Sequence, residues 1–297
     1  MNLTKSHALL ILASLGFSFI LIFSTLLKES GISSLQQVFS RITISLPLLL
    51  ILTAGKIKLK KKDITYFAAT GLTFSAFLLS ALSSIALGCP VPVTVALIYT
   101  QPFFTAIIAY LTKKEKITLQ KLAIVITGML GAFLASGITT PSELSLNLGI
   151  LPALLGGFLY AVYLYLKRTQ KKDYTPLQAL FNTFLFATPI TLLLGLTITA
   201  FTENPLLTSF TIPDSYQLSL LTSFAIFSTV LPYGLLNYVK TGEVSPITEG
   251  TLLLLDPALH VVWATTILKQ YVTPLQYLGI TLVLSSTILM LKIKGKT

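Results

Sequence analysis

The sequence predicts an all-α membrane protein whose ten transmembrane helices form two inverted five-helix repeats. Three observations lead to this fold class: long apolar runs, a one-sided distribution of Lys and Arg, and an internal repeat. Of the 297 residues, 54% are hydrophobic and only 10% are charged. A soluble domain carries about 25% charged residues. We therefore expect most of the chain to lie in a lipid bilayer.

Each predicted span is long enough to cross ~30 Å of hydrocarbon as a helix that rises ~1.5 Å per residue. The first follows a single Lys and lacks a small-residue cleavage site, so we expect it to remain as a helix rather than be removed as a signal peptide. A tight turn at Cys89–Pro90 separates the third from the fourth. The longest connection runs from about Thr202 to Gln217. The ten segments are 7–27, 33–54, 64–87, 91–112, 119–138, 148–167, 176–201, 217–239, 247–268 and 274–292.

The positive charges predict the orientation of these spans. Eighteen of the 21 Lys and Arg residues fall on one side when the segments alternate across the membrane. Lys28 and Lys269 fall on the other side, and Arg41 lies within the second segment. Cytoplasmic loops carry the excess of Lys and Arg. We therefore expect a multi-pass protein of the cell membrane (inner or plasma membrane) with both termini in the cytoplasm.

The internal repeat predicts two related halves, 1–142 and 143–297. Ser34–Phe39 and Pro47 align with Pro176–Phe181 and Pro189. Later in each half, Gln101-Pro102 aligns with Asp256-Pro257. Because five spans per half is an odd number, the second half would enter the membrane from the opposite face. Inverted repeats of this kind are typical of transporters, with the solute site near the midplane.

Polar residues at matching positions of the fourth and ninth spans indicate a solute site. Charged groups inside a bilayer cost several kcal/mol unless they are paired or hydrated. At ~100° per residue, the three ionisable residues of the ninth span share one helix face. Two ordinary alternatives exist. In one, Asp256 satisfies backbone groups freed by Pro257, and in the other, Glu249 is solvated near the membrane surface. The ionisable residues are Glu249, Asp256 and His260, and their counterparts in the fourth span are Thr94, Gln101 and Thr105.

We predict substrate binding by Tyr99, Gln101, Tyr163, Asp256 and His260. A supporting or coupling role is predicted for Arg41, Thr94, Thr105 and Glu249. Buried carboxyls can carry a proton, so Asp256 is the candidate for proton coupling. Tyrosines also serve as interfacial anchors, and a lone Arg often forms a structural ion pair or extends to the interface.

The sequence favours no catalytic, metal or cofactor site. Motifs such as His-Glu-x-x-His, Gly-x-Ser-x-Gly and the phosphate-binding Gly-rich loop are absent. With two His and one Cys, Cys89, a conventional zinc site is not expected. The net charge of +11 is spread over short clusters between apolar runs, so anionic lipid rather than nucleic acid is the expected partner.

The order of these motifs resembles the drug/metabolite transporter superfamily in its EamA-domain branch. The resemblance covers essentially the whole chain and includes Arg41 and both polar-Pro pairs. It extends to a Glu-x-x-Thr-x-x-Gln pattern after the fourth span, which Glu115, Ile117-Thr118 and Gln120 match loosely. Gln101 stands where the branch often has an acid, and Lys269-Gln270 where it often has Gly-Glu. The resemblance implies alternating access and export of amino acids or similar metabolites.

We therefore expect a monomeric permease for small polar or amphipathic metabolites and no enzymatic activity. Two alternatives stay open at this stage. A membrane enzyme acting on a lipid would need a catalytic constellation. A non-transporting scaffold or sensor would have no requirement for a solute-accessible cavity.

Overall fold

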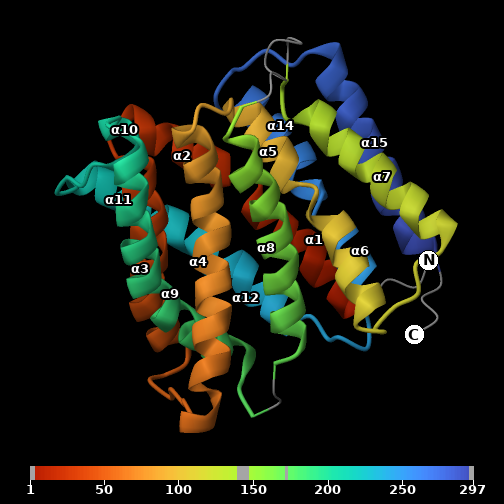
Figure 1. Cartoon of the computed structure of the whole chain (residues 1–297), viewed down its shortest axis with the longest axis horizontal. Coiled ribbons are helices and arrows are strands. Elements are labelled where there is room, and N and C mark those ends of the chain that lie inside the picture. Colours follow the sequence, from red (N-terminus) through yellow and green to blue (C-terminus); the bar gives the residue numbers. More distant parts are fainter. Residues whose placement is uncertain (1–3, 139–146, 171–172, 294–297) are drawn as a thin grey trace.

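The computed structural model describes residues 4–138, 147–170 and 173–293, and all regular elements within these ranges are helical. Figure 1 shows the helices arranged as one elongated bundle. The helices before residue 139 are α1 (Lys5–Phe17), α2 (Ile20–Glu29), α3 (Ser34–Leu52), η1 (Lys61–Asp63), α4 (Ile64–Ala86), α5 (Val91–Ile98), α6 (Gln101–Leu111) and α7 (Leu119–Ala135). The later helices are α8 (Ile150–Arg168), α9 (Pro176–Ile198), η3 (Thr199–Phe201), α10 (Pro205–Thr208), α11 (Ser215–Ala225), η4 (Ile226–Val230), α12 (Leu231–Tyr238), α13 (Pro246–Leu252), α14 (Leu255–Thr266) and α15 (Pro274–Lys292).

The all-helical prediction is confirmed for the described residues. Eight of the predicted spans coincide with helical stretches long and apolar enough to cross a membrane. The predicted fifth span is the shorter α7, whose 17 residues rise about 26 Å. The predicted ninth span is interrupted between α13 and α14. The count of ten spans stays a prediction.

Prolines explain the breaks in the fourth and ninth spans. Proline has no backbone N–H, so it cannot bond the carbonyl four residues earlier. In the fourth span, α5 ends at Ile98, four residues before Pro102. In the ninth, α13 ends at Leu252 and α14 begins at Leu255, just before Pro257. Each span therefore places irregular backbone in the middle of the protein.

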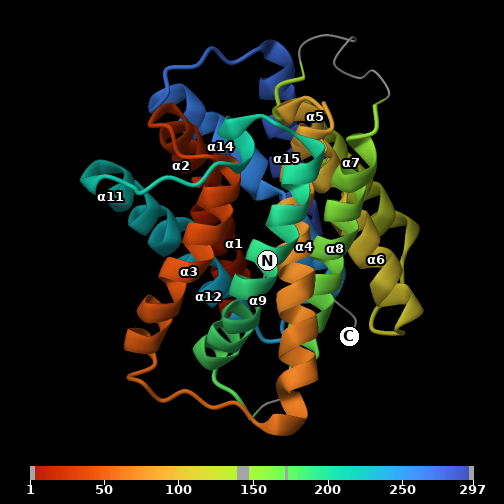
Figure 2. The same ribbon diagram turned by 60° about the vertical axis from the view of Figure 1, so that its left-hand side comes forward.

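Equivalent helices of the two halves pack against each other in opposite directions. Gly195 near the end of α9 faces Leu35 at the start of α3. Each of the two aligned glutamines bonds the segment that follows the other helix. Gln36 of α3 donates to the carbonyl of Thr211, which follows α9, at 2.6 Å. Gln178 of α9 donates to the carbonyl of Lys56, which follows α3, at 2.5 Å. Figure 2 shows α3 beside α9.

Helices α7 and α15 form a second antiparallel pair across glycines. A Cβ added at Gly131 would lie 2.7 Å from the backbone nitrogen of Val283. A Cβ added at Gly279 would lie 2.5 Å from the backbone nitrogen of Ala135. Small residues allow such close backbone approach between membrane helices. The predicted boundary between the halves, 142/143, lies outside the described residues.

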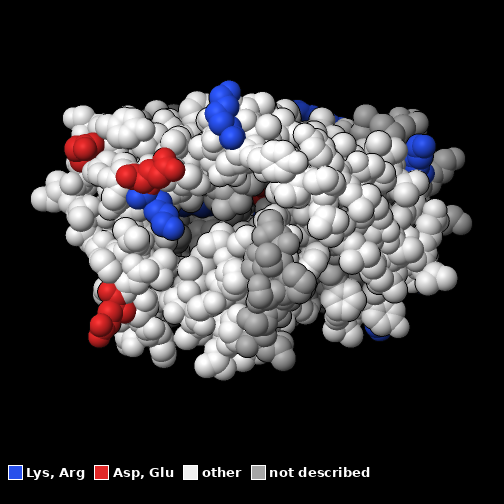
Figure 3. All heavy atoms as spheres, turned by 90° about the horizontal axis from the view of Figure 1, so that it is seen from above, with Lys and Arg blue, Asp and Glu red and all other residues white. Residues whose placement is uncertain are grey.

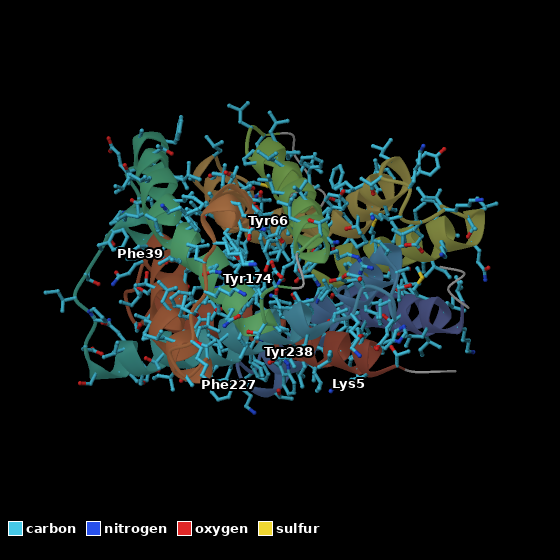
Figure 4. The ribbon with its side chains drawn as sticks, turned by 90° about the horizontal axis from the view of Figure 1, so that it is seen from below. Lys5, Phe39, Tyr66, Tyr174, Phe227 and Tyr238 are labelled. Carbon is cyan, nitrogen blue, oxygen red and sulfur yellow. The ribbon has the colours of Figure 1, made fainter. Side chains whose placement is uncertain are left out.

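The bundle has an upper and a lower end. At the upper end of Figure 1, α2, α4 and α9 end, and at the lower end, α3, α8 and α12 end. Figure 3 shows the upper end with few basic residues and a hollow near its middle. Figure 4 shows the lower end, where Lys5 lies and where Tyr66 and Tyr174 are close together. The upper end is the one predicted to lie outside the cell.

Candidate functional site

A central cavity of about 360 Å³ lies between the two halves. Its mouth is at the upper end, where Lys28, Ser34 and Val91 contribute to the wall. Small-molecule sites typically measure about 300–1,000 Å³. The volume therefore suits a small metabolite. The wall is largely apolar, and its polar or aromatic members at depth are Arg41, Thr94, Tyr99, Tyr160, Tyr233 and Asp256.

The two interrupted spans meet at this cavity through one hydrogen bond. Tyr99 follows the last residue of α5, and Asp256 lies in the first turn of α14. The Tyr99 hydroxyl donates to Asp256 Oδ2 at 2.8 Å. Each residue thus lies beside a break that a proline produces.

Arg41 forms part of the same wall from α3 and is 3% exposed. Its guanidinium carbon lies 4.7 Å from the centre of the Phe224 ring. The Tyr233 hydroxyl lies beside the guanidinium. Among the described residues Arg41 has no carboxylate partner, and its Nε and Nη2 atoms have no hydrogen-bond partner. The ion-pair and interfacial interpretations of Arg41 are therefore wrong for this conformation.

Below the cavity, a packed layer of aromatic side chains closes the bundle. Tyr163 and Tyr233 are 2% and 1% exposed, and their ring centres lie 6.0 Å apart. Phe74 lies between α8 and α12, with its ring centre 5.2 Å from that of Tyr163 and 4.9 Å from that of Tyr233. Phe17 packs edge-on against Tyr233 at 4.7 Å. This layer separates the central cavity from the lower end.

A second cavity of about 550 Å³, the lower cavity, lies at the other end. Its wall includes Thr105, Arg168 and Glu249. Glu249 binds two cations at the end of α8: Lys167 donates to its Oε1, and Arg168 Nη1 donates to its Oε2 at 2.5 Å. The side chains of Glu249, Lys167 and Arg168 are 1%, 6% and 12% exposed. We call these three residues the latch cluster.

The latch cluster joins several elements of the lower end. Lys167 also donates to the carbonyl of Leu236 in α12 at 2.9 Å. Arg168 Nη2 donates to the carbonyl of Val244, which precedes α13, at 2.7 Å. The end of α8 is thereby attached to α12 and to the start of the ninth span. Opening a path at this end would require these bonds to break.

The structure divides the predicted site residues among three environments. Arg41, Thr94, Tyr99 and Asp256 line the central cavity. Thr105 and Glu249 line the lower cavity. Gln101, Tyr163 and His260 line neither of these two cavities. The predicted continuous stripe on the ninth span is divided because the helix breaks between Leu252 and Leu255, which separates Glu249 from Asp256.

The three residues outside both cavities have packing roles. Gln101 is 2% exposed and donates to Thr105 Oγ1 at 2.5 Å. Tyr163 belongs to the aromatic layer. His260 Nδ1 lies 3.3 Å from the carbonyl of Ser18, at the interruption between α1 and α2. The imidazole therefore contacts a broken segment of the first span instead of the solute cavity.

Sequence reasoning missed the role of Lys167 and Arg168, because basic residues at the end of a span were interpreted only as orientation signals. The sequence contained a signal for this role, because Glu249 on the ninth span is a carboxylate with no basic partner nearby in sequence. No group of three or more His, Cys, Asp or Glu residues in the described part of the chain could hold a metal ion.

Comparisons with known proteins concern the family and the fold. The family model for the EamA-like transporter family matches residues 4–137 and 147–292. A solved structure described as a crystal structure of protein has a TM-score of 0.77 and 12% sequence identity, with 97% of each chain covered. At that identity the likeness shows the fold alone. No match was found among curated proteins.

Proposed function

The chain belongs to the EamA-like transporter family, and we propose that it moves a small polar or amphipathic metabolite across the cell membrane by alternating access. It is a multi-pass membrane protein built from two repeats. The proposal includes ten crossings, inverted repeats and both termini in the cytoplasm. It also includes a monomer as the working unit. The apolar faces of α7 and of the α13–α14 segment would supply the fifth and ninth crossings.

The observation that carries the proposal is the difference between the two ends. The central cavity has its mouth at the upper end, while the aromatic layer and the latch cluster close the lower end. Alternating access requires one site that opens to either side in turn. This structure would then be the outward-open state. Opening of the latch cluster together with closure of the upper mouth would give the inward-open state.

The wall chemistry supports a metabolite with both apolar and polar parts. Aromatic rings of Phe77, Tyr160 and Phe224 offer apolar surface, and Arg41 and Asp256 offer opposite charges. α-Amino acids combine these features and are the first class to assay. Proton coupling through Asp256 is part of the proposal, since its carboxyl lies in the wall and accepts a hydrogen bond from Tyr99.

Purified protein provides the test. A thermal-stabilisation screen across amino acids, sugars and nucleosides identifies ligands, because a molecule that binds only the folded state raises Tm. Counterflow of the identified ligand into proteoliposomes then measures transport. Saturable counterflow supports the proposal. Binding without counterflow would favour a sensor, and turnover of a lipid by the purified protein would favour an enzyme.

A further inference from the structure

Arg41 is a buried cation with no counter-charge in the part of the chain that the structure describes, and this property needs an explanation. The residue is 3% exposed and lies within a membrane-spanning helix. Charged side chains at such depth are paired with one another or with backbone carbonyls, or they mark a solute pathway. Asp256, on the wall of the same cavity, forms no ion pair with it in the described structure. Arg41 therefore has no negatively charged partner among the described residues.

The unsatisfied atoms of Arg41 form one edge of the guanidinium. Nε and Nη2 lie on the same side of the planar group, and both are buried without a hydrogen-bond partner. Carboxylates bind a guanidinium through two parallel N–H···O bonds of this kind. The flat ring of Phe224 at 4.7 Å supports the group from one face. Arg41 lines the central cavity, so this unsatisfied edge belongs to a side chain that a solute in the cavity contacts.

The charges around the cavity favour a monoanionic group over a phosphate. Among the described residues, the wall contains two cations, Arg41 and Lys28, and one acid, Asp256. Lys28 lies at the exposed mouth, so Arg41 is the cation that a solute meets at depth. One guanidinium matches one carboxylate in charge and in geometry. A doubly charged phosphate would leave charge uncompensated at this depth.

We infer that Arg41 is the binding residue for a carboxylate group of the transported solute. The solute's carboxylate pairs with the Nε/Nη2 edge, and its apolar part lies against the aromatic wall. The Tyr99–Asp256 pair lies on the same wall and is available to a donor group of the solute. This inference rests on the proposed function, and it names the chemistry that a substrate must carry.

The test compares a carboxylate with its uncharged isostere. Purified wild-type protein is titrated with 3-phenylpropionate, with 3-phenylpropionamide and with inorganic phosphate, and Tm is recorded. We expect stabilisation by the carboxylate at a concentration roughly 10- to 100-fold lower than by the amide, since hydrogen bonds to charged groups contribute about 1.5–3 kcal/mol. Phosphate should not stabilise the protein. Equal effects of acid and amide, no effect of either, or a preference for phosphate would overturn the inference.

Two variants separate a binding role from a structural one. Arg41→Met removes the unpaired charge, so the ligand-free protein should melt at the wild-type temperature or above it while its preference for the carboxylate is lost. Arg41→Lys keeps the charge but not the two-donor edge, so it should show an intermediate preference. A large fall in the ligand-free Tm of Arg41→Met would instead assign Arg41 a structural role. Failure of the carboxylate preference in a protein that still shows counterflow would refute this inference alone.

Discussion

Removal of the charge on Glu249 should open the lower end of the protein. In the variant Glu249→Gln, Lys167 keeps its charge but loses its partner while its side chain is 6% exposed. Loss of one member of a buried ion pair costs about 3–5 kcal/mol. Because Arg168 is 12% exposed and the lower cavity adjoins the cluster, we use the lower limit, about 3 kcal/mol. This cost applies to the closed lower end, since an open end would hydrate both cations. The ratio of inward-open to outward-open protein should rise about 100-fold.

Cysteine labelling measures this shift. Cys89 is the single cysteine, so Cys89→Ser gives a cysteine-free background. A reporter at Ala81 lies in the wall of the central cavity, and a reporter at Ala161, which is 0% exposed, lies in the wall of the lower cavity. In Glu249→Gln, the thiol at position 81 should react more slowly with a reagent added outside, and the thiol at position 161 should react faster with one added inside.

A matched control and a double variant make the result specific. Asp173→Asn changes an exposed ion pair with Lys60 at the same end and should leave both labelling rates unchanged. Combining Lys167→Met with Glu249→Gln removes the two most deeply buried charges of the cluster and leaves only that of Arg168, so it should restore part of the wild-type ratio. Unchanged labelling rates in folded Glu249→Gln protein would refute the role of the latch cluster.

Three further results are expected. Gly279→Ala should lower the free energy of unfolding by about 1–3 kcal/mol, because the added Cβ would lie 2.5 Å from the backbone of α7. The control Gly242→Ala should not change Tm, because a Cβ at this position meets nothing within 4 Å. In the cysteine-free background, an impermeant thiol reagent should label Leu87→Cys in intact cells and Lys62→Cys only after permeabilisation; the reverse pattern would invert the proposed orientation. Asp256→Asn should abolish solute-driven proton movement, measured with a pH dye in proteoliposomes, and unchanged proton flux would exclude coupling through this residue.

Much of the fold follows from local physics that the sequence displays. The apolar runs predicted the helices, and the polar residues at matching positions of the fourth and ninth spans indicated the region where Tyr99 and Asp256 meet. The repeated Gln36 and Gln178 have a simple physical basis. The backbone N–H of each donates to the N-cap hydroxyl of its own helix, and its side-chain amide donates to a carbonyl in the loop after the partner helix.

The remaining features depend on contacts between distant segments. The bond between Lys167 and Glu249 joins residues 82 positions apart, and composition alone assigns such a lysine to the membrane surface. Helical periodicity places His260 on the same face as Asp256. The first span is interrupted at Ser18 beside it, and the ring nitrogen of His260 contacts the carbonyl of Ser18 instead of the cavity. The isolation of Arg41 was also invisible, since an ion-pair partner can come from many helices.

Alternating access makes one cavity accessible from both sides of the membrane in turn, and a single reporter tests this without knowledge of the solute. Ala81→Cys in the cysteine-free background is reconstituted in vesicles of right-side-out and inside-out orientation, and an impermeant thiol reagent is added outside each. Alternating access predicts that the thiol reacts in both preparations, and that a bound ligand slows both reactions. Reaction in the right-side-out vesicles alone, at every reagent concentration and also when Ala81→Cys is combined with Glu249→Gln, would contradict alternating access.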